Sequence, residues 1–396
     1  MGSRDYFLKR TILTLLFVLC YSLFASRVWA FDVGLMLDQN AYYSGVESDT
    51  AFAYKGVAIP RLSGLMGNIG EFYISAGINY QYDPWNFVPE LLRTELSWSG
   101  SGVELSLGRM SYSDPLGYIA SGLLDGGRFS LHTKAGSLSV GAWYTGFIYK
   151  KRINIEMTYD EKESNNTAFD YDNFFGSYFA PRRALIALDW EHQGLGERVF
   201  ARLSLLGQID LTDAKLNSQY TIGKMIVPFR IFAVTFGGCF ELIENSENMD
   251  MAFATELELS WKTAFQGLSL LARYSSAKSD SLVAFLPVTT NKQGQILAAK
   301  LSGLSMASLD YTARLHRTFT FGLTSSYFLL SNFNNASDII SGNLLGAEFF
   351  GAFYWNPLPD ISVNLGGGAF LPSLGNITPD GKIFWKVELN LVLSLF

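Results

Sequence analysis

Apolar and polar side chains alternate along the chain from residue 31 onward, in segments of about ten residues. One face of the segment 71–82 carries Phe72, Ile74, Ala76, Ile78 and Tyr80, and the other carries Tyr73, Ser75, Gly77, Asn79 and Gln81. The segments 92–99, 199–210 and 251–261 divide in the same way. A helix would place apolar residues three and four positions apart, so the period of two predicts β-strands.

The alternation predicts eighteen strands, with sixteen as the alternative because two of the segments are weak enough to be loops. The predicted strands are 32–38, 50–59, 70–81, 90–98, 102–110, 122–134, 137–149, 182–192, 197–210, 218–227, 230–242, 250–262, 267–277, 294–316, 317–330, 343–355, 360–371 and 383–396.

The connections between these segments alternate in length. Short turns lie at 99–102, 135–137, 193–197 and 356–360, and long polar loops lie near 38–49, 111–121, 150–181, 278–293, 331–342 and 372–382. Four tryptophans stand on the apolar face, each at the end of a strand that enters a short turn: Trp98, Trp190, Trp261 and Trp355. Indole rings prefer the membrane–water boundary, so these four residues predict an aromatic girdle. Both patterns are typical of a transmembrane antiparallel up-and-down β-barrel.

The composition agrees with a membrane protein that spans by strands. Apolar residues make up 48% of the chain and charged residues 17%, whereas about a quarter of a soluble domain is charged. No stretch outside the N-terminus reaches the roughly 18 apolar residues of a spanning helix. In lipid, only helices and closed barrels satisfy every backbone polar group, which leaves the barrel.

The first thirty residues resemble a cleavable signal peptide. Arg4, Lys9 and Arg10 form a basic start, an apolar run follows, and Val28 and Ala30 precede the expected cleavage site. We therefore divide the chain into a signal peptide, 1–30, and a barrel, 31–396. Without the signal peptide the chain holds 26 basic and 35 acidic residues, a formal charge of −9, and no basic patch that would favour nucleic acid.

The last predicted strand carries a family resemblance. Leu389, Leu391, Leu393 and Leu395 alternate with polar residues, and the chain stops at Phe396. This resembles Gram-negative outer-membrane β-barrel proteins of the porin type. The resemblance implies recognition of Phe396 by the barrel-assembly machinery, periplasmic termini and extracellular long loops. Phe396 departs from the pattern, because Leu395 occupies the apolar face; a bulge, or the looser signal of a spirochaete member, would reconcile the two.

Charged residues on the face opposite the apolar one are the candidates for lining an aqueous lumen, since a barrel of this size is too wide for side chains to fill. The candidates are Arg93, Glu95, Glu104, Arg128, Lys134, Arg202, Glu256, Glu258, Arg273, Arg314 and Glu348. Their mixed signs predict weak ion selectivity, with at most a mild cation preference.

Two loops leave alternatives open. The segment 111–121 is either tucked into the lumen or an ordinary external turn, and 150–181 either constricts the lumen, binds a cation or covers the mouth. Catalysis is not expected, because the pair Ser130 and His132 has no evident third partner. We expect no cofactor and no metal site.

The sequence favours a channel for passive diffusion of small hydrophilic solutes. One alternative is a transporter of hydrophobic molecules such as long-chain fatty acids, motivated by the apolar stretch 282–288. Its usual N-terminal plug has no room here, because the first strand begins almost at Phe31. A surface adhesin or antigen is the other alternative. The expected partners are outer-membrane lipid, the barrel-assembly machinery and small solutes, and homo-oligomer formation stays open.

Overall fold

A computed structural model describes residues 31–47, 49–82, 86–195, 198–244, 248–279, 282–332 and 343–395. The predicted signal peptide, the predicted assembly residue Phe396 and most of the predicted loop 331–342 lie outside these residues.

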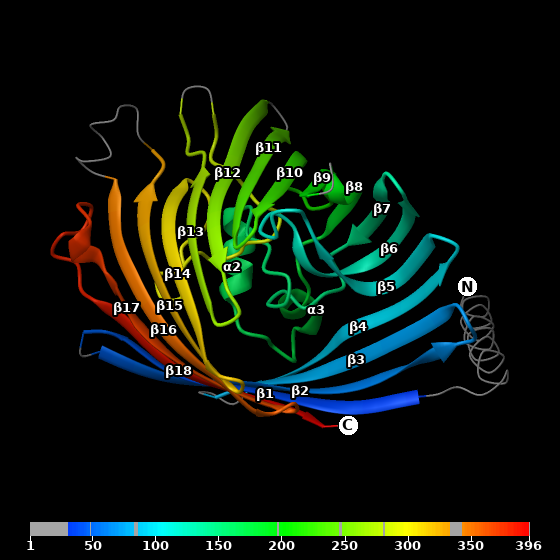
Figure 1. The fold of residues 1–396 in the computed structure, drawn as a ribbon, viewed down its shortest axis with the longest axis horizontal. Coiled ribbons are helices and arrows are strands. Elements are labelled where there is room, and N and C mark those ends of the chain that lie inside the picture. The colour runs from blue at the N-terminus through cyan, green and yellow to red at the C-terminus, as the bar shows by residue number, and fades with distance from the viewer. Residues whose placement is uncertain are drawn as a thin grey trace.

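In the described part of the chain, eighteen strands form one closed antiparallel barrel. The first nine are β1 (Phe31–Val46), β2 (Asp49–Met66), β3 (Gly70–Gln81), β4 (Asn86–Gly100), β5 (Val103–Ser113), β6 (Ser121–Thr133), β7 (Gly136–Tyr144), β8 (Arg183–Leu195) and β9 (Val199–Asp210). The others are β10 (Asn217–Phe229), β11 (Phe232–Glu244), β12 (Met249–Lys262), β13 (Gln266–Ser275), β14 (Leu304–His316), β15 (Phe319–Leu330), β16 (Leu344–Leu358), β17 (Ile361–Leu371) and β18 (Phe384–Leu395). Each strand pairs with the next, and β18 pairs with β1 (Figure 1). The predicted eighteen-stranded barrel is confirmed.

Several predicted boundaries are wrong. The strand predicted at 50–59 runs on to Met66. The loop predicted at 38–49 is mostly strand, since β1 runs to Val46 and pairs with β2 from Asp49. The strand predicted at 137–149 ends at Tyr144. The strand predicted at 294–316 begins only at Leu304, because Ile296 and Leu297 belong to a loop that packs against the inner wall and so reads as an apolar strand.

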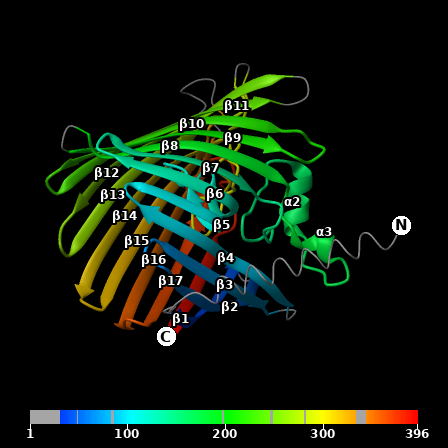
Figure 2. The ribbon, with the colours of Figure 1, turned by 90° about the vertical axis from the view of Figure 1, so that its right-hand side faces the viewer.

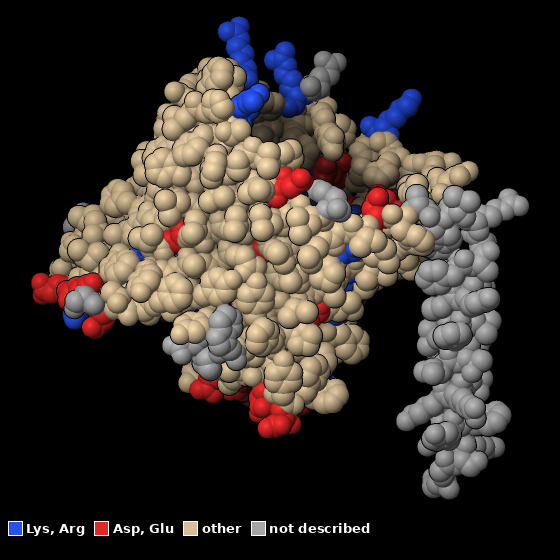
Figure 3. Space-filling view, turned by 90° about the horizontal axis from the view of Figure 1, so that it is seen from below, with Lys and Arg blue, Asp and Glu red and all other residues tan. Residues whose placement is uncertain are grey.

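Large apolar side chains cover the outer surface of the wall. Members exposed over more than a third of their area include Leu96, Leu107, Leu188, Leu205, Leu257, Leu270, Leu309 and Leu365. Figure 3 shows this surface as a broad area with few charged residues. Exposed leucine of this extent is unusual in a soluble protein and suits a lipid-facing wall.

The two ends of the barrel differ. Short connections follow the even-numbered strands and lie at the same end as Phe31 and Leu395, whereas the long connections lie at the other end. The longest one, between β7 and β8, carries α2 (Tyr159–Asn166) and α3 (Phe174–Tyr178). Figure 1 shows both helices within the ring of strands, and Figure 2 shows them at one mouth. In the described residues, no helix is long and apolar enough to cross a membrane. A 3-10 turn, η1 (Pro372–Leu374), follows β17.

Candidate functional site

Three of the long connections turn into the lumen and fill one side of it. They are the β5–β6 loop (114–120), the β7–β8 loop (145–182) and the β13–β14 loop (276–303). Their apolar residues form one core with the inner wall, to which they contribute Leu116, Ile119, Ile148, Ile153, Ile155, Met157, Phe285, Val288 and Leu301. The segment 111–121 is therefore tucked inward, and the β7–β8 loop both enters the lumen and rises above the mouth. Burial of this core holds the loops in place.

Asp114 shapes the β5–β6 loop through its carboxylate. Oδ1 accepts hydrogen bonds from the N–H groups of Leu116 (2.8 Å) and Gly117 (2.9 Å), and Oδ2 from those of Ile119 and Ala120 (both 2.9 Å). Burial raises the pKa of the Asp114 carboxyl above its usual value, and the four N–H donors oppose the rise. One side chain thus satisfies four backbone groups of a loop that has no regular structure.

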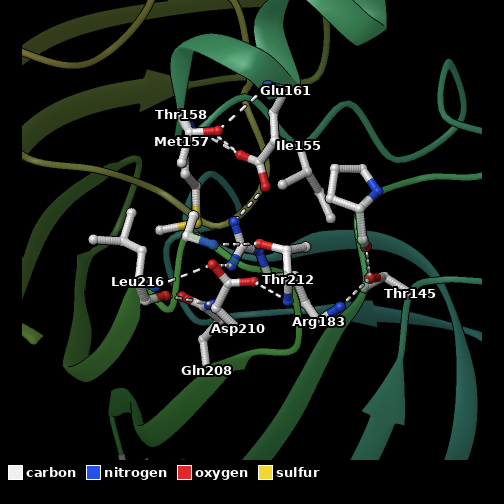
Figure 4. Close-up of polar contacts among 12 residues, drawn as sticks. Thr145, Ile155, Met157, Thr158, Glu161, Arg183, Gln208, Asp210, Thr212 and Leu216 are labelled. Carbon is white, nitrogen blue, oxygen red and sulfur yellow. Dashed lines mark hydrogen bonds and ion pairs between the residues drawn. The ribbon is translucent and has the colours of Figure 1, made fainter. Parts of the chain in front are cut away.

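A buried ionic cluster fastens α2 to the wall (Figure 4). Arg183, fully buried at the start of β8, forms ion pairs with Asp210 of β9 and with Glu161 of α2. Glu161 also accepts the N–H groups of Met157 and Thr158 (both 2.9 Å), while the Thr158 hydroxyl caps the N-terminus of α2. Since an unpaired buried charge is costly, each carboxylate depends on Arg183 and Arg183 on both of them.

The β13–β14 loop is hydrogen-bonded to both the β5–β6 loop and the β7–β8 loop. The N–H of Thr289 donates to Ile119 O (3.0 Å), and the N–H of Thr290 donates to Asn154 O (2.8 Å). The wall also holds this loop from β10 and β11. Glu241 Oε2 accepts the N–H of Leu286 (2.9 Å), and Tyr220 donates its hydroxyl to Leu286 O (2.7 Å).

Basic side chains gather around a cavity of about 780 Å³ at the mouth that bears the helices. Lys55 of β2, Lys151 and Arg152 of the β7–β8 loop and Lys292 of the β13–β14 loop line it, together with the carboxylates of Glu90 and Glu156. Arg152 is paired with Glu90 (2.8 Å) and Glu156 with Lys300 (2.5 Å).

The three lysines therefore supply a positive charge that these carboxylates do not cancel. Burial, followed by the charges of Lys55 and Lys292, lowers the pKa of the Lys151 amine, and Glu156 opposes this change. Clustered lysines with amide side chains nearby, such as Asn79 and Asn154, are suited to a hydrated anion that also carries hydroxyl groups.

Most of the residues expected to line the lumen occur in ion-paired groups. Arg93 Nε donates to Glu95 (2.7 Å) near the short-turn end of β4. Glu104, Arg128 and Arg202 line a cavity of about 320 Å³, in which Arg128 lies 3.7 Å from Glu104. In a third group, Glu256 contacts Arg273 (2.9 Å) and Lys224 (3.3 Å). Pairing of both signs reduces the net field that these residues exert on a solute.

The remaining candidates have different surroundings. Glu258 is half-buried on β12, and Arg314 is exposed near the end of β14. Lys134 is not a wall residue, because β6 ends at Thr133 and Lys134 is exposed in the turn. Glu348 does not face open lumen, since the β13–β14 loop covers it and leaves it 1% exposed.

Ser130 and His132, which the sequence suggested as a pair, each contact other residues. Ser130 is hydrogen-bonded by the Ser139 hydroxyl (2.8 Å), while His132 Nδ1 lies 2.8 Å from the Ser137 hydroxyl and His132 Nε2 lies 3.7 Å from Glu104. Among the described residues, no group of three His, Cys, Asp or Glu side chains is arranged to hold a metal ion.

Sequence reasoning missed the lysine-lined cavity, because its members come from three distant segments. It also missed Asp114 as the organiser of its loop. The pattern Thr158-x-x-Glu161 was a readable signal of a capping box and so of α2. Nothing in the sequence pattern joins Glu161 to Arg183.

Comparison with known proteins finds likeness in structure and none in sequence. No family model matches the chain, and no curated protein matches it. Pseudomonas aeruginosa OccK2 (OpdF) superposes with a TM-score of 0.60 at 12% identity, over 92% of this chain and 97% of that one. OccD3 (OpdP) from the same organism gives 0.54 at 12%, over 92% and 91%. Acinetobacter baumannii OccAB1 gives 0.60 at 11%, over 92% and 97%. The chain is similar in its closed barrel fold to the Occ outer-membrane proteins.

Proposed function

We propose that the chain is an outer-membrane channel through which small hydrophilic solutes diffuse, and that it favours anionic ones. The cavity of about 780 Å³ carries the proposal, because Lys55, Lys151 and Lys292 line it from three different segments. The overall acidic excess favours a mild cation preference. A solute, however, responds to the charges nearest its path, and in this cavity the basic residues outnumber the carboxylates.

The same proposal fixes an orientation. The long loops are extracellular and both termini periplasmic, with Trp98, Trp190, Trp261 and Trp355 as a girdle at the periplasmic boundary. In support, these residues lie in β4, β8, β12 and β16, the strands that lead into short turns. A membrane-impermeant maleimide should label Asp172→Cys on intact cells and Lys134→Cys only after lysis, since the native Cys239 is buried. The reverse labelling would contradict the orientation.

Planar bilayers test the transport function. Discrete conductance steps are expected from the refolded protein, with a reversal potential that indicates anion preference. Glucuronate is a suitable test solute because OccK2 was crystallised in complex with it. It should reduce the chloride current as it occupies the cavity.

The double variant Lys151→Met, Lys292→Met should weaken both effects. Its matched control is Lys134→Met, Lys262→Met, which removes two exposed lysines at the short-turn end of the barrel. Absence of conductance steps would contradict the channel, and equal behaviour of the two double variants would contradict the role of the lysines.

A transporter of hydrophobic molecules is not favoured. The lumen is occupied by connections between strands, and its mouth is lined by lysine and amide groups, which suit water-soluble molecules. An adhesin role for the loops stays a prediction. Deletion of the segment 160–177 that abolished host binding while conductance persisted would support it.

A further inference from the structure

A small closed hairpin lies within the β13–β14 loop. The N–H of Gln293 donates to Ala299 O (2.7 Å), and the N–H of Ala299 donates back to Gln293 O (2.9 Å). In the segment that these two residues enclose, three successive N–H groups point at one carboxylate. Glu348 of β16 accepts them from Gln295 (2.6 Å), Ile296 (3.0 Å) and Leu297 (2.9 Å). Glu348 is 1% exposed, so this is a buried anion seat filled by the protein's own side chain.

The sequence of the hairpin is suited to this seat. Gly294 has a φ of +81°, and a Cβ at this position would lie 2.8 Å from Glu348 Oε2. Only glycine adopts such a backbone without strain and leaves room for the carboxylate. Ile296, Leu297 and Ala299 pack on an apolar pad of the wall formed by Leu304, Phe328 and Phe370. The hairpin is thus held on one side by the carboxylate and on the other by apolar contact.

The hairpin begins between two cavities of the lumen, because Lys292 lines one and Gln295 lines the other. Lys292 lines the lysine cavity, while Gln295 lines a second cavity of about 470 Å³ that also touches Asn40, Asp310 and Glu388. Lining residues of the two cavities also lie side by side on the wall, because Asn40 of the second pairs in register with Lys55 of the first. The segment 292–295 therefore lies between the lysine cavity and the second cavity.

We propose that Glu348 is a positioning residue that holds this segment in place, and so sets the width of the passage between the two cavities. The proposal rests on the proposed channel function. Glu348 does not touch the solute. It acts through Lys292 and Gln295, whose positions depend on where Glu348 holds the hairpin. Without the carboxylate, three partly buried N–H groups lose their acceptor and gain one only by moving toward water, which carries the hairpin away from the wall.

Single-channel recording of Glu348→Ala tests this role. Its control is Asp310→Ala, which also removes one inner-wall carboxylate, but one hydrogen-bonded by the wall hydroxyls of Thr324 (2.6 Å) and Ser308 (3.1 Å). Glu348→Ala should raise the unit conductance by at least half, add current noise and reduce the block by glucuronate. Asp310→Ala should change ion selectivity without added noise. Formate, which can enter the vacated seat, should restore quiet conductance to Glu348→Ala alone.

Two further measurements test the same role of Glu348. Gly294→Ala preserves the charge of Glu348 but obstructs its seat, so it should reproduce the noise of Glu348→Ala. Hydrogen exchange at residues 295–297 should accelerate in both variants. If Glu348→Ala and Asp310→Ala behave alike and formate has no effect, the positioning role is overturned. If the wild-type protein carries no current, the channel function fails instead, while exchange still reports whether Glu348 seats the hairpin.

Discussion

Replacing Asp114 by Asn removes half of the acceptors that organise the β5–β6 loop. In the wild type, Oδ1 serves the N–H groups of Leu116 and Gly117, and Oδ2 those of Ile119 and Ala120. An amide keeps one oxygen and places an NH2 group against the other two donors. Each buried donor left without an acceptor costs about 1–3 kcal/mol, so the loop should lose about 2–6 kcal/mol.

Hydrogen exchange of the folded protein in detergent measures this loss. Because 1.4 kcal/mol is a factor of ten, the amides of residues 116–120 should exchange at least about 30-fold faster in Asp114→Asn. The exposed carboxylate of Asp172 in the β7–β8 loop supplies the control Asp172→Asn, which should leave these rates unchanged. Unchanged protection in Asp114→Asn would refute the reasoning, since it would mean that the apolar core alone holds the loop inward.

Three other changes test separate features. Glu161→Gln leaves Arg183 without one of its two partner charges and should destabilise the folded β7–β8 loop by about 3–5 kcal/mol. Proteolysis within 145–182 should become faster, and an unchanged rate would contradict the anchoring of α2. Because the pKa of Lys151 is lowered, anion selectivity should fall with rising pH at a lower pH than for an ordinary lysine, and Lys151→Met should flatten the reversal-potential profile. Leu257→Arg on the outer wall should lower the free energy of unfolding by about 2–4 kcal/mol, measured by urea titration of the vesicle-inserted barrel. An unchanged free energy of unfolding would contradict lipid exposure at this position.

The strands could be predicted well where one face is wet and the other apolar. β3 was predicted at its observed bounds, because apolar residues alternate along it without interruption. β1 was cut short because Gln39 breaks the alternation. Its side-chain oxygen accepts the hydroxyl of Tyr80 (2.5 Å) and that of Tyr54. Such a compensation depends on two other strands, and a period of two along one strand does not reveal it.

The site was less predictable, for a physical reason. Parity along a strand separates the two faces of the wall, but it does not say what covers the inner one. Parity gave Glu348 the inner face, and a loop some fifty residues earlier in the chain lies over it. Lys55, Lys151 and Lys292 meet only because two loops turn inward, and that turn depends on the apolar core of the loops and on the anchors at Arg183 and Glu241.

The pairing of β1 with β18 has a consequence for the order of assembly. Every other ladder among the described strands joins consecutive strands, so its loop-closure entropy is small. The seam joins Leu35 to Leu395, about 360 residues apart, and its closure costs about 5 kcal/mol of chain entropy by the logarithmic rule. Hairpins should therefore zip first and the seam last. Until then two unpaired strand edges stand open, and each is a template on which a foreign strand can add.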